Sequence, residues 1–116
     1  MKYEEIGSYT KAEAEAALIR NNPAELTRVV IGIGLHTADF DWAESYCMKL
    51  VGHPDEYVRG DTILAFAHLA RRGAALDETK VKPIVQNALK DGSTFVRGHA
   101  HDTVEDIVQF LGWRFA

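Results

Sequence analysis

One four-residue motif occurs twice in this chain and constrains its fold more than any other feature. Tyr-Val-Arg-Gly at positions 57–60 recurs as Phe-Val-Arg-Gly at positions 95–98, a spacing of 38 residues. The apolar positions before the motif keep the same phase, since Tyr46 corresponds to Ile84 and Val51 to Leu89 at that offset. A repeat of this length is typical of two-helix units that stack, because a single unit cannot bury its apolar surface alone.

Helix start and stop signals divide the chain into six helices joined by short turns. Each periodic apolar run is preceded by a capping residue, whose side chain can accept hydrogen bonds from the first helical turn. Four of the runs are followed by a glycine. The predicted helices lie at about 11–21, 23–37, 41–52, 55–72, 78–90 and 94–111. The residues that begin them are Thr10, Asn22, Asp39 or Asp41, Asp55, Asp77 and Ser93. We therefore predict one all-α domain over residues 1–116, with helix pairs at 11–37, 41–72 and 78–111.

The continuous apolar run at 29–35 is the one segment that also fits a buried strand. A helix start signal lies just upstream, because Asn22 can cap, Pro23 suits a first helical turn and Glu25 can reach back to the cap. We therefore predict a helix, in which Gly32 and Gly34 mark the close approach of another helix.

The second helices of the last two pairs resemble those of the HEAT-repeat family. In that family an Asp in the turn precedes a helix that begins with Val-Arg, and here Asp91 lies six residues before Arg97. The apolar positions that follow are Ala100, Val104 and Ile107, and we expect Ala100 to lie in the core between Val96 and Val104. The second pair has His53 where the Asp should stand, and Asp55 is the candidate substitute. The resemblance implies a short right-handed α-solenoid of three antiparallel pairs, in which Arg59 and Arg97 bridge turns and neighbouring repeats.

The third pair carries the polar outer surface that a terminal repeat needs. At the offset of 38 residues, four positions of the second pair change to polar or charged residues in the third. They are Ile63 to His101, Leu64 to Asp102, Ala67 to Glu105 and His68 to Asp106. We therefore predict that the array ends at the third pair.

Composition excludes several classes of protein. The net charge of -4 argues against a dedicated nucleic-acid binder. Cys47 is the one cysteine, so the chain has no internal disulfide and suits a reducing compartment. No apolar run reaches the roughly 18 residues of a membrane helix. Residues 1–5 carry acids where a signal peptide has basic residues, so the sequence predicts a cytoplasmic protein with no membrane association.

No catalytic or metal-binding constellation is recognisable. His99, His101 and Asp102 are the most metal-like group, but the two histidines lie about 200° apart around a helix and point to opposite sides. Cys47 falls in phase with inward positions and is expected to be a buried, inert thiol. We therefore expect no metal, no cofactor and no enzymatic activity.

Clustered acids and aromatic residues favour a protein-binding surface. Between Asp39 and Asp61 the chain has six acids and two basic residues, which predicts an acidic face. Trp42, Tyr57 and Trp113 are candidate aromatic anchors, or else core residues. We expect Asp39, Asp41 and Asp61 to be exposed, so charge reversal of any one of them to Lys should leave the fold nearly intact, within about 0.5 kcal/mol. The repeat phase leaves some polar positions of the second helices outside the core, where we expect them to line the inner surface of the solenoid: Asp61, His68, His99 and Asp106. The predicted partner-binding residues are Asp39, Asp41, Trp42, Asp61, His68, His99, Asp102 and Asp106.

A small acidic protein of this repeat type resembles the immunity proteins of bacterial polymorphic toxin systems, including contact-dependent growth inhibition. The resemblance implies a non-enzymatic protein that binds a cognate toxin domain, basic and of nuclease type, and occludes its active site. The alternative is a HEAT-like scaffold or adaptor, such as an accessory subunit of a bilin lyase. A HEAT-like DNA glycosylase would need a basic groove, and the acidic balance argues against it.

Overall fold

The computed structural model describes residues 6–115, and these residues form six helices and no strand. The helices are α1 (Lys11–Arg20), α2 (Pro23–His36), α3 (Phe40–Met48), α4 (Glu56–Arg71), α5 (Glu78–Ala88) and α6 (Thr94–Leu111). All six predicted helices are therefore present, and the largest difference is that α3 ends at Met48 rather than near residue 52. Residues 1–5, on which the signal-peptide argument rested, lie outside the described residues. None of the described helices has the length and apolar character needed to span a bilayer.

The predicted caps account for where the helices begin. Thr10 and Glu13 form a reciprocal capping box at the start of α1. Asn22 Oδ1 accepts a hydrogen bond from the backbone N–H of Glu25 at 3.0 Å. The Glu25 carboxylate does not return to the cap as predicted, because it binds the guanidinium of Arg20 at 2.9 and 2.7 Å. At α3 the cap is Asp39 rather than Asp41. The remaining predicted caps, Asp55, Asp77 and Ser93, are all present.

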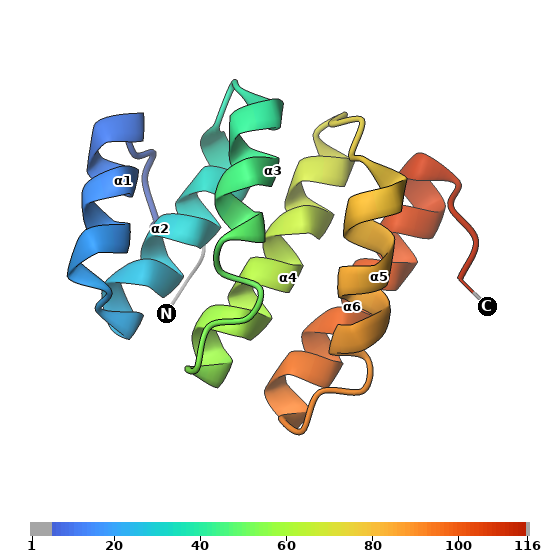
Figure 1. Cartoon of the computed structure of the whole chain (residues 1–116). Coiled ribbons are helices and arrows are strands. Elements are labelled where there is room, and N and C mark those ends of the chain that lie inside the picture. The colour runs from blue at the N-terminus through green and yellow to red at the C-terminus, as the bar shows by residue number, and fades with distance from the viewer. Residues whose placement is uncertain (1–5, 116) are drawn as a thin grey trace.

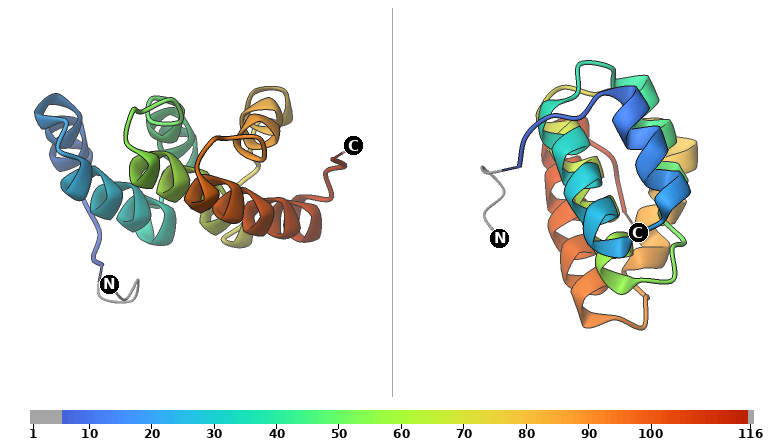
Figure 2. Two further views of the ribbon diagram at one scale, coloured as in Figure 1. Left: turned by 90° about the horizontal axis from the view of Figure 1, so that it is seen from below. Right: turned by 90° about the vertical axis from the view of Figure 1, so that its left-hand side faces the viewer.

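The helices lie in two layers. One layer holds α1, α3 and α5, and the other holds α2, α4 and α6 (Figures 1 and 2). The central helix of the second layer, α4, packs against α2 on one side and α6 on the other. Consecutive helices run in opposite directions, so the N-termini of α3 and α4 lie at opposite ends of the molecule (Figure 1). This polarity decides which parts of the sequence can share a surface.

The apolar run at 29–35 lies in α2, as predicted, and its two glycines make the close approaches. A Cβ atom on Gly34 would lie 3.3 Å from Cα of Ala65, so Gly34 lets α2 and α4 pack backbone to backbone. A Cβ atom on Gly32 would lie 2.6 Å from the carbonyl oxygen of Gly7. Gly32 therefore accommodates the N-terminal segment before α1 and not another helix.

The core confirms the predicted helical phase at two tested positions. Cys47 is fully buried, and this burial raises the pKa of its thiol to about 12. The thiol is therefore protonated at neutral pH and is a poor nucleophile. Ala100 is also fully buried, which places that side of α6 in the core.

Candidate partner-binding surfaces

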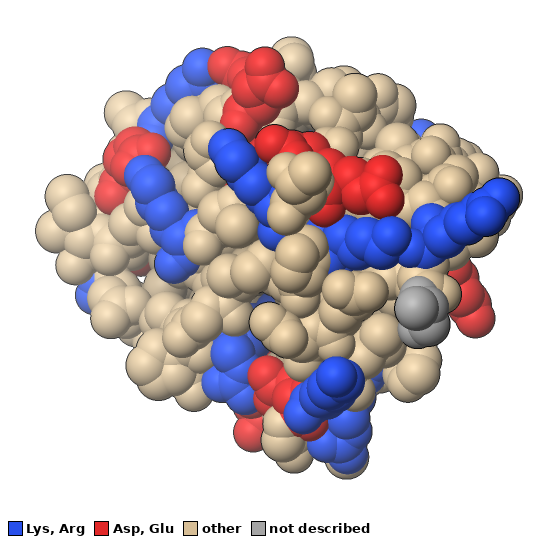
Figure 3. Space-filling model, turned by 45° about the vertical axis from the view of Figure 1, so that its right-hand side comes forward, with Lys and Arg blue, Asp and Glu red and all other residues tan. Residues whose placement is uncertain are grey.

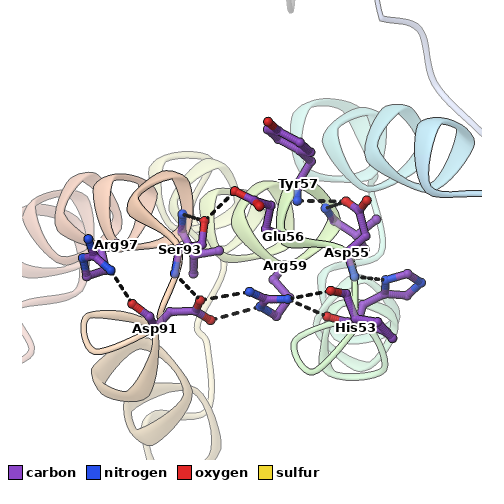
Figure 4. A network of polar contacts seen from close by, with 11 residues as sticks. His53, Asp55, Glu56, Tyr57, Arg59, Asp91, Ser93 and Arg97 are labelled. Carbon is purple, nitrogen blue, oxygen red and sulfur yellow. Dashed lines mark hydrogen bonds and ion pairs between the residues drawn. The ribbon is translucent and has the colours of Figure 1, made fainter.

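Arg59 joins the second helix pair to the third. Its Nε and Nη2 atoms donate to the two carboxylate oxygens of Asp91 at 3.0 and 2.9 Å (Figure 4). Arg59 Nη1 also donates to the carbonyl oxygens of His53 and Pro54. The guanidinium holds the pKa of Asp91 below its ordinary value. Arg97 donates to the carbonyl oxygen of Asp91, and this bond stays within the third pair. The bridging role that the resemblance implied is therefore present at Arg59, which makes it a structural residue.

In the second pair, His53 makes the same two contacts with its turn and helix that Asp91 makes in the third pair. Asp91 Oδ1 accepts from the N–H of Ser93 at 2.9 Å, and His53 Nδ1 accepts from the N–H of Asp55 at 3.0 Å (Figure 4). The carbonyl oxygen of each residue accepts from the arginine six positions later. His53 Nε2 also lies 2.7 Å from Oδ1 of Asn21 in the first pair. The expected substitute, Asp55, is instead the cap of α4.

The acids between Asp39 and Asp61 do not form one acidic face. Asp39 and Asp41 lie at the N-terminus of α3, whereas Asp55 lies at the N-terminus of α4, at the opposite end of the molecule (Figure 1). Asp61 is buried. On the side that carries α5 and α6, acidic and basic side chains lie next to one another (Figure 3). Sequence neighbours are separated here because α3 and α4 are antiparallel.

Four of the predicted site residues come together between α4 and α6, in what we call the α4–α6 seam: Asp61, His68, His99 and Asp106. Oδ1 of Asp61 lies 3.3 Å from Nε2 of His99. Asp106 forms an ion pair with Arg71 at 3.6 Å. The expectation that Asp61 and His68 lie outside the core is wrong, since each is 7% exposed. The reason is that α4 is flanked on both sides, so its polar side chains are covered by neighbouring helices.

His68 is a buried neutral histidine at pH 7. Burial lowers its pKa to about 4, and the nearby charges of Arg71 and His99 act in the same direction. His36 and His68 occupy the same position of the repeat, which predicts that each is half-buried and bonded to a neighbouring carbonyl group. His36 makes such a contact, since its Nε2 lies 2.7 Å from the carbonyl oxygen of Ile6, but the residue is exposed and not half-buried. His68 instead contacts the guanidinium of Arg71.

Aromatic rings extend the α4–α6 seam to its exposed end. Tyr57 packs against Phe95 with ring centroids 4.9 Å apart, and Phe95 packs against His99 at 4.3 Å. Tyr57 is 55% exposed and so is available to a partner. Trp113 is 9% exposed and belongs to the core. Sequence reasoning did not select Phe95, although the repeated motif pairs it with Tyr57.

Asp39, Asp41 and Trp42 form a second candidate surface, at the N-terminus of α3. Beside it lies a cavity of about 250 Å³, whose lining includes Tyr9, Lys11, Asp39 and Trp42. We call this cavity the Trp42 pocket. Lys11 Nζ lies 2.5 Å from Oδ2 of Asp39 and 5.7 Å from the centre of the Trp42 ring. No sequence pattern links Lys11 to residues 28 positions away, and it was not predicted.

Asp102, the remaining predicted site residue, lies on the exposed side of α6. His101, Asp102 and Glu105 are exposed, as the terminal-repeat argument predicted. Val108 and Phe110 are 46% and 45% exposed, so this surface becomes apolar near its C-terminal end. His99 and His101 point apart, and no group of three potential metal ligands occurs among residues 6–115.

Comparison with known proteins identifies a fold and no family. No protein-family model matches the chain, and no curated protein matches its sequence. One solved structure with this fold is a chain in the crystal structure of a CDI complex from Cupriavidus taiwanensis. The two chains are 23% identical, and they superpose with a TM-score of 0.80 over 95% of this chain and 97% of the other. This likeness shows the fold over nearly the whole length of both chains.

Proposed function

We propose that this chain is an immunity-type protein that binds a cognate toxin domain and blocks its active site without catalysing a reaction. The observation that carries the proposal is the end-to-end fold likeness to a chain of a CDI complex. In contact-dependent growth inhibition, a small cytoplasmic protein protects the cell by binding the toxin domain. The buried thiol of Cys47 and the structural role of Arg59 support a binding function, because neither residue is available for chemistry.

The architecture proposed for this role is a short, right-handed, HEAT-like α-solenoid. Two helix layers and the link between Arg59 and Asp91 support the assignment, since each pair contacts the next through its turn. Stacked helix pairs form an extended, rigid surface. Such a surface binds a partner with little loss of conformational entropy.

The partner proposed is a basic, nuclease-type domain. The net charge of -4 and the exposed carboxylates of Asp41, Asp102 and Glu105 support this choice. Carboxylates on the inhibitor can occupy the positions that substrate phosphates take on the toxin. Complementary charge speeds association, so the association rate should fall as salt rises. No cofactor, nucleic acid or membrane takes part in this mechanism.

Co-expression with a toxin-domain gene, sought among the genes adjacent to the one for this chain, tests the proposal. We expect protected growth, a complex that survives purification, and toxin activity that falls to zero at one equivalent of the chain. An association rate that stays constant from low to high salt would contradict the electrostatic mechanism. Growth arrest despite co-expression, together with recovery of the chain among the subunits of another assembly, would contradict the immunity role.

A further inference from the structure

We infer that the Trp42 pocket is a receptor for one cationic side chain of the partner, and that Lys11 occupies it in the free protein. This inference deepens the proposed function, on which it rests for the partner's identity. It names the chemistry that the site recognises, an ammonium or guanidinium group. It also assigns Lys11 as an internal competitor that the partner displaces.

One wall of the Trp42 pocket is the chain segment before α1. This segment lies directly on α2 because Gly32 has no side chain, and a Cβ atom there would lie 2.8 Å from the Tyr9 ring. His36 Nε2 holds the carbonyl oxygen of Ile6 at 2.7 Å. The position of Tyr9 at the pocket is therefore set by contacts with α2 and does not depend on a ligand.

The indole of Trp42 also lines the pocket, and its ring is held in place by neighbouring residues. Trp42 packs against Tyr46 with ring centroids 5.4 Å apart. The Tyr46 hydroxyl is buried and donates to the carbonyl oxygen of Ala14 in α1 at 2.7 Å. A ring fixed in this way keeps its face toward the cavity, which is the geometry that a cation–π contact needs.

The pocket combines this aromatic face with a carboxylate. Asp39 lies at its rim, and the hydrogen bond from Lys11 holds the pKa of Asp39 below its ordinary value, so the carboxylate is charged at neutral pH. Asp41 is exposed two residues further along, in the first turn of α3. A ring face beside an ionised carboxylate is complementary to a cation, and the bound Lys11 ammonium demonstrates this complementarity within the molecule.

Lys11 is a weakly held occupant. Its side chain is 58% exposed and that of Asp39 is 45% exposed, and ion pairs this open contribute little to stability. Lys11 is also the first residue of α1, where the positive end of the helix disfavours a cation. A partner arginine would donate two parallel hydrogen bonds to the carboxylate while the interface excludes water, so it should displace Lys11.

Titration with N-acetyl-arginine amide, followed by NMR, tests the receptor without any toxin. The indole N–H signal of Trp42 should shift, and that of Trp113, which lies in the core near α6, should stay constant. N-acetyl-citrulline amide has nearly the same shape without the charge and should shift neither signal. Equal shifts with arginine and citrulline probes, or equal shifts of both indoles, would overturn the inference.

Two variants separate competition from general surface attraction. Lys11→Met should bind the arginine probe about threefold to tenfold more tightly, because the internal cation is gone. Adding Asp39→Asn should remove this gain, while Asn keeps the cap that the N–H of Trp42 requires. Equal affinities of the wild-type protein and Lys11→Met would overturn the competitor role. These titrations succeed or fail independently of growth protection, so the two proposals can be rejected separately.

Discussion

The two sides of α4 are packed in different ways. Toward α2, Gly34 lies against Ala65 and the Cβ atom of His68, and Arg72 at the end of α4 donates to the carbonyl oxygen of Gly34 at 3.1 Å. Toward α6, the Phe95 ring fills the space above Gly60, and a buried Asp61 lies 3.3 Å from Nε2 of His99. The contact with α2 is therefore a close approach of small groups, whereas the contact with α6 contains an aromatic ring and a buried carboxylate.

This difference has an energetic consequence. The contribution of apolar packing to stability depends on how well the groups fit together and not on pH. Buried polar groups destabilise a protein unless their partners are in place, so the α4–α6 seam depends on exact pairing and on protonation. We therefore expect perturbations at the seam to cost more than equivalent ones toward α2.

The largest effect is expected from Ala100→Asp. Ala100 is fully buried, and an aspartate there would place an unpaired charge in the core of α6. We expect a loss of about 3–5 kcal/mol and unfolding of α5 and α6 before the other helices. Urea denaturation gives the total loss, and amide hydrogen exchange shows which helices open first. His101→Asp is the matched control, because His101 is exposed on the same helix. Loss of protection in α1 and α2 before α6 would reverse the comparison.

Asp61→Lys should be the next most disruptive change. Asp61 is 7% exposed and lies close to His99, so a lysine would place an ammonium group in a buried seam in place of a carboxylate. We expect a loss of about 2–4 kcal/mol, in place of the near-neutral effect that the sequence alone indicated. Asp41→Lys reverses the same charge at an exposed position and should stay within about 0.5 kcal/mol. Equal thermal midpoints for the two variants would show that Asp61 is not held as described.

The sequence predicted the helices well because their signals are local. A cap such as Thr10 and its partner Glu13 are three residues apart, so the pattern is readable without the fold. The link between Arg59 and Asp91 spans 32 residues, yet the repeat made it accessible through the family resemblance.

The candidate sites were harder to predict because burial and proximity are tertiary properties. Asp61 and His68 read as exposed polar positions, and only the flanking of α4 by two helices buries them. The pairing of Lys11 with Asp39 depends on where α1 lies relative to α3. The expected acidic face failed because a count of charges along the chain does not include helix direction.

The pH dependence of stability should report on His68. Its pKa falls from an ordinary 6.5 to about 4 in the folded protein, so the unfolded chain binds a proton first as the solution is acidified. Stability should therefore be highest above pH 6.5, fall between pH 6.5 and 4, and lose nothing more from this group below pH 4. At about 1.4 kcal/mol per pH unit, the whole window corresponds to about 3 kcal/mol.

Urea midpoints between pH 7 and 5 measure this effect in wild type and in His68→Gln. The carboxylates with lowered pKa, such as Asp91, begin to destabilise the fold only near their ordinary value of 3.8, so they contribute little in this range. The variant should show a flatter profile. A slope that remains unchanged in His68→Gln would assign the acid sensitivity to another group and remove the pH contrast between the two sides of α4.

The smallest expected effect comes from adding one methyl group at each of the two interfaces of α4, at Gly60 toward α6 and at Gly34 of α2. A Cβ atom on Gly60 would lie 2.5 Å from the Phe95 ring, which Tyr57 and His99 hold in place. Overpacking of this kind exceeds the gain in helix propensity, so Gly60→Ala should lose about 1–2 kcal/mol. On Gly34 the Cβ atom would lie 3.3 Å from Ala65, a distance that a slight helix shift relieves, and Gly34→Ala should stay within about 0.5 kcal/mol.

A double-mutant cycle identifies the ring as the cause of that loss. Phe95→Leu removes the atoms that meet the new methyl group, so Gly60→Ala should cost at least about 0.5 kcal/mol less in the Phe95→Leu background. The same background should leave the effect of Gly34→Ala unchanged, because Gly34 lies in α2 and its neighbours are Ala65 and His68 of α4. Strict additivity of the changes at positions 60 and 95 would show that the Phe95 ring is not the cause of the loss. If Gly34→Ala proves the more damaging substitution, the α2 side is the more tightly packed one. The pairing at the seam would then be a consequence of packing elsewhere in the molecule.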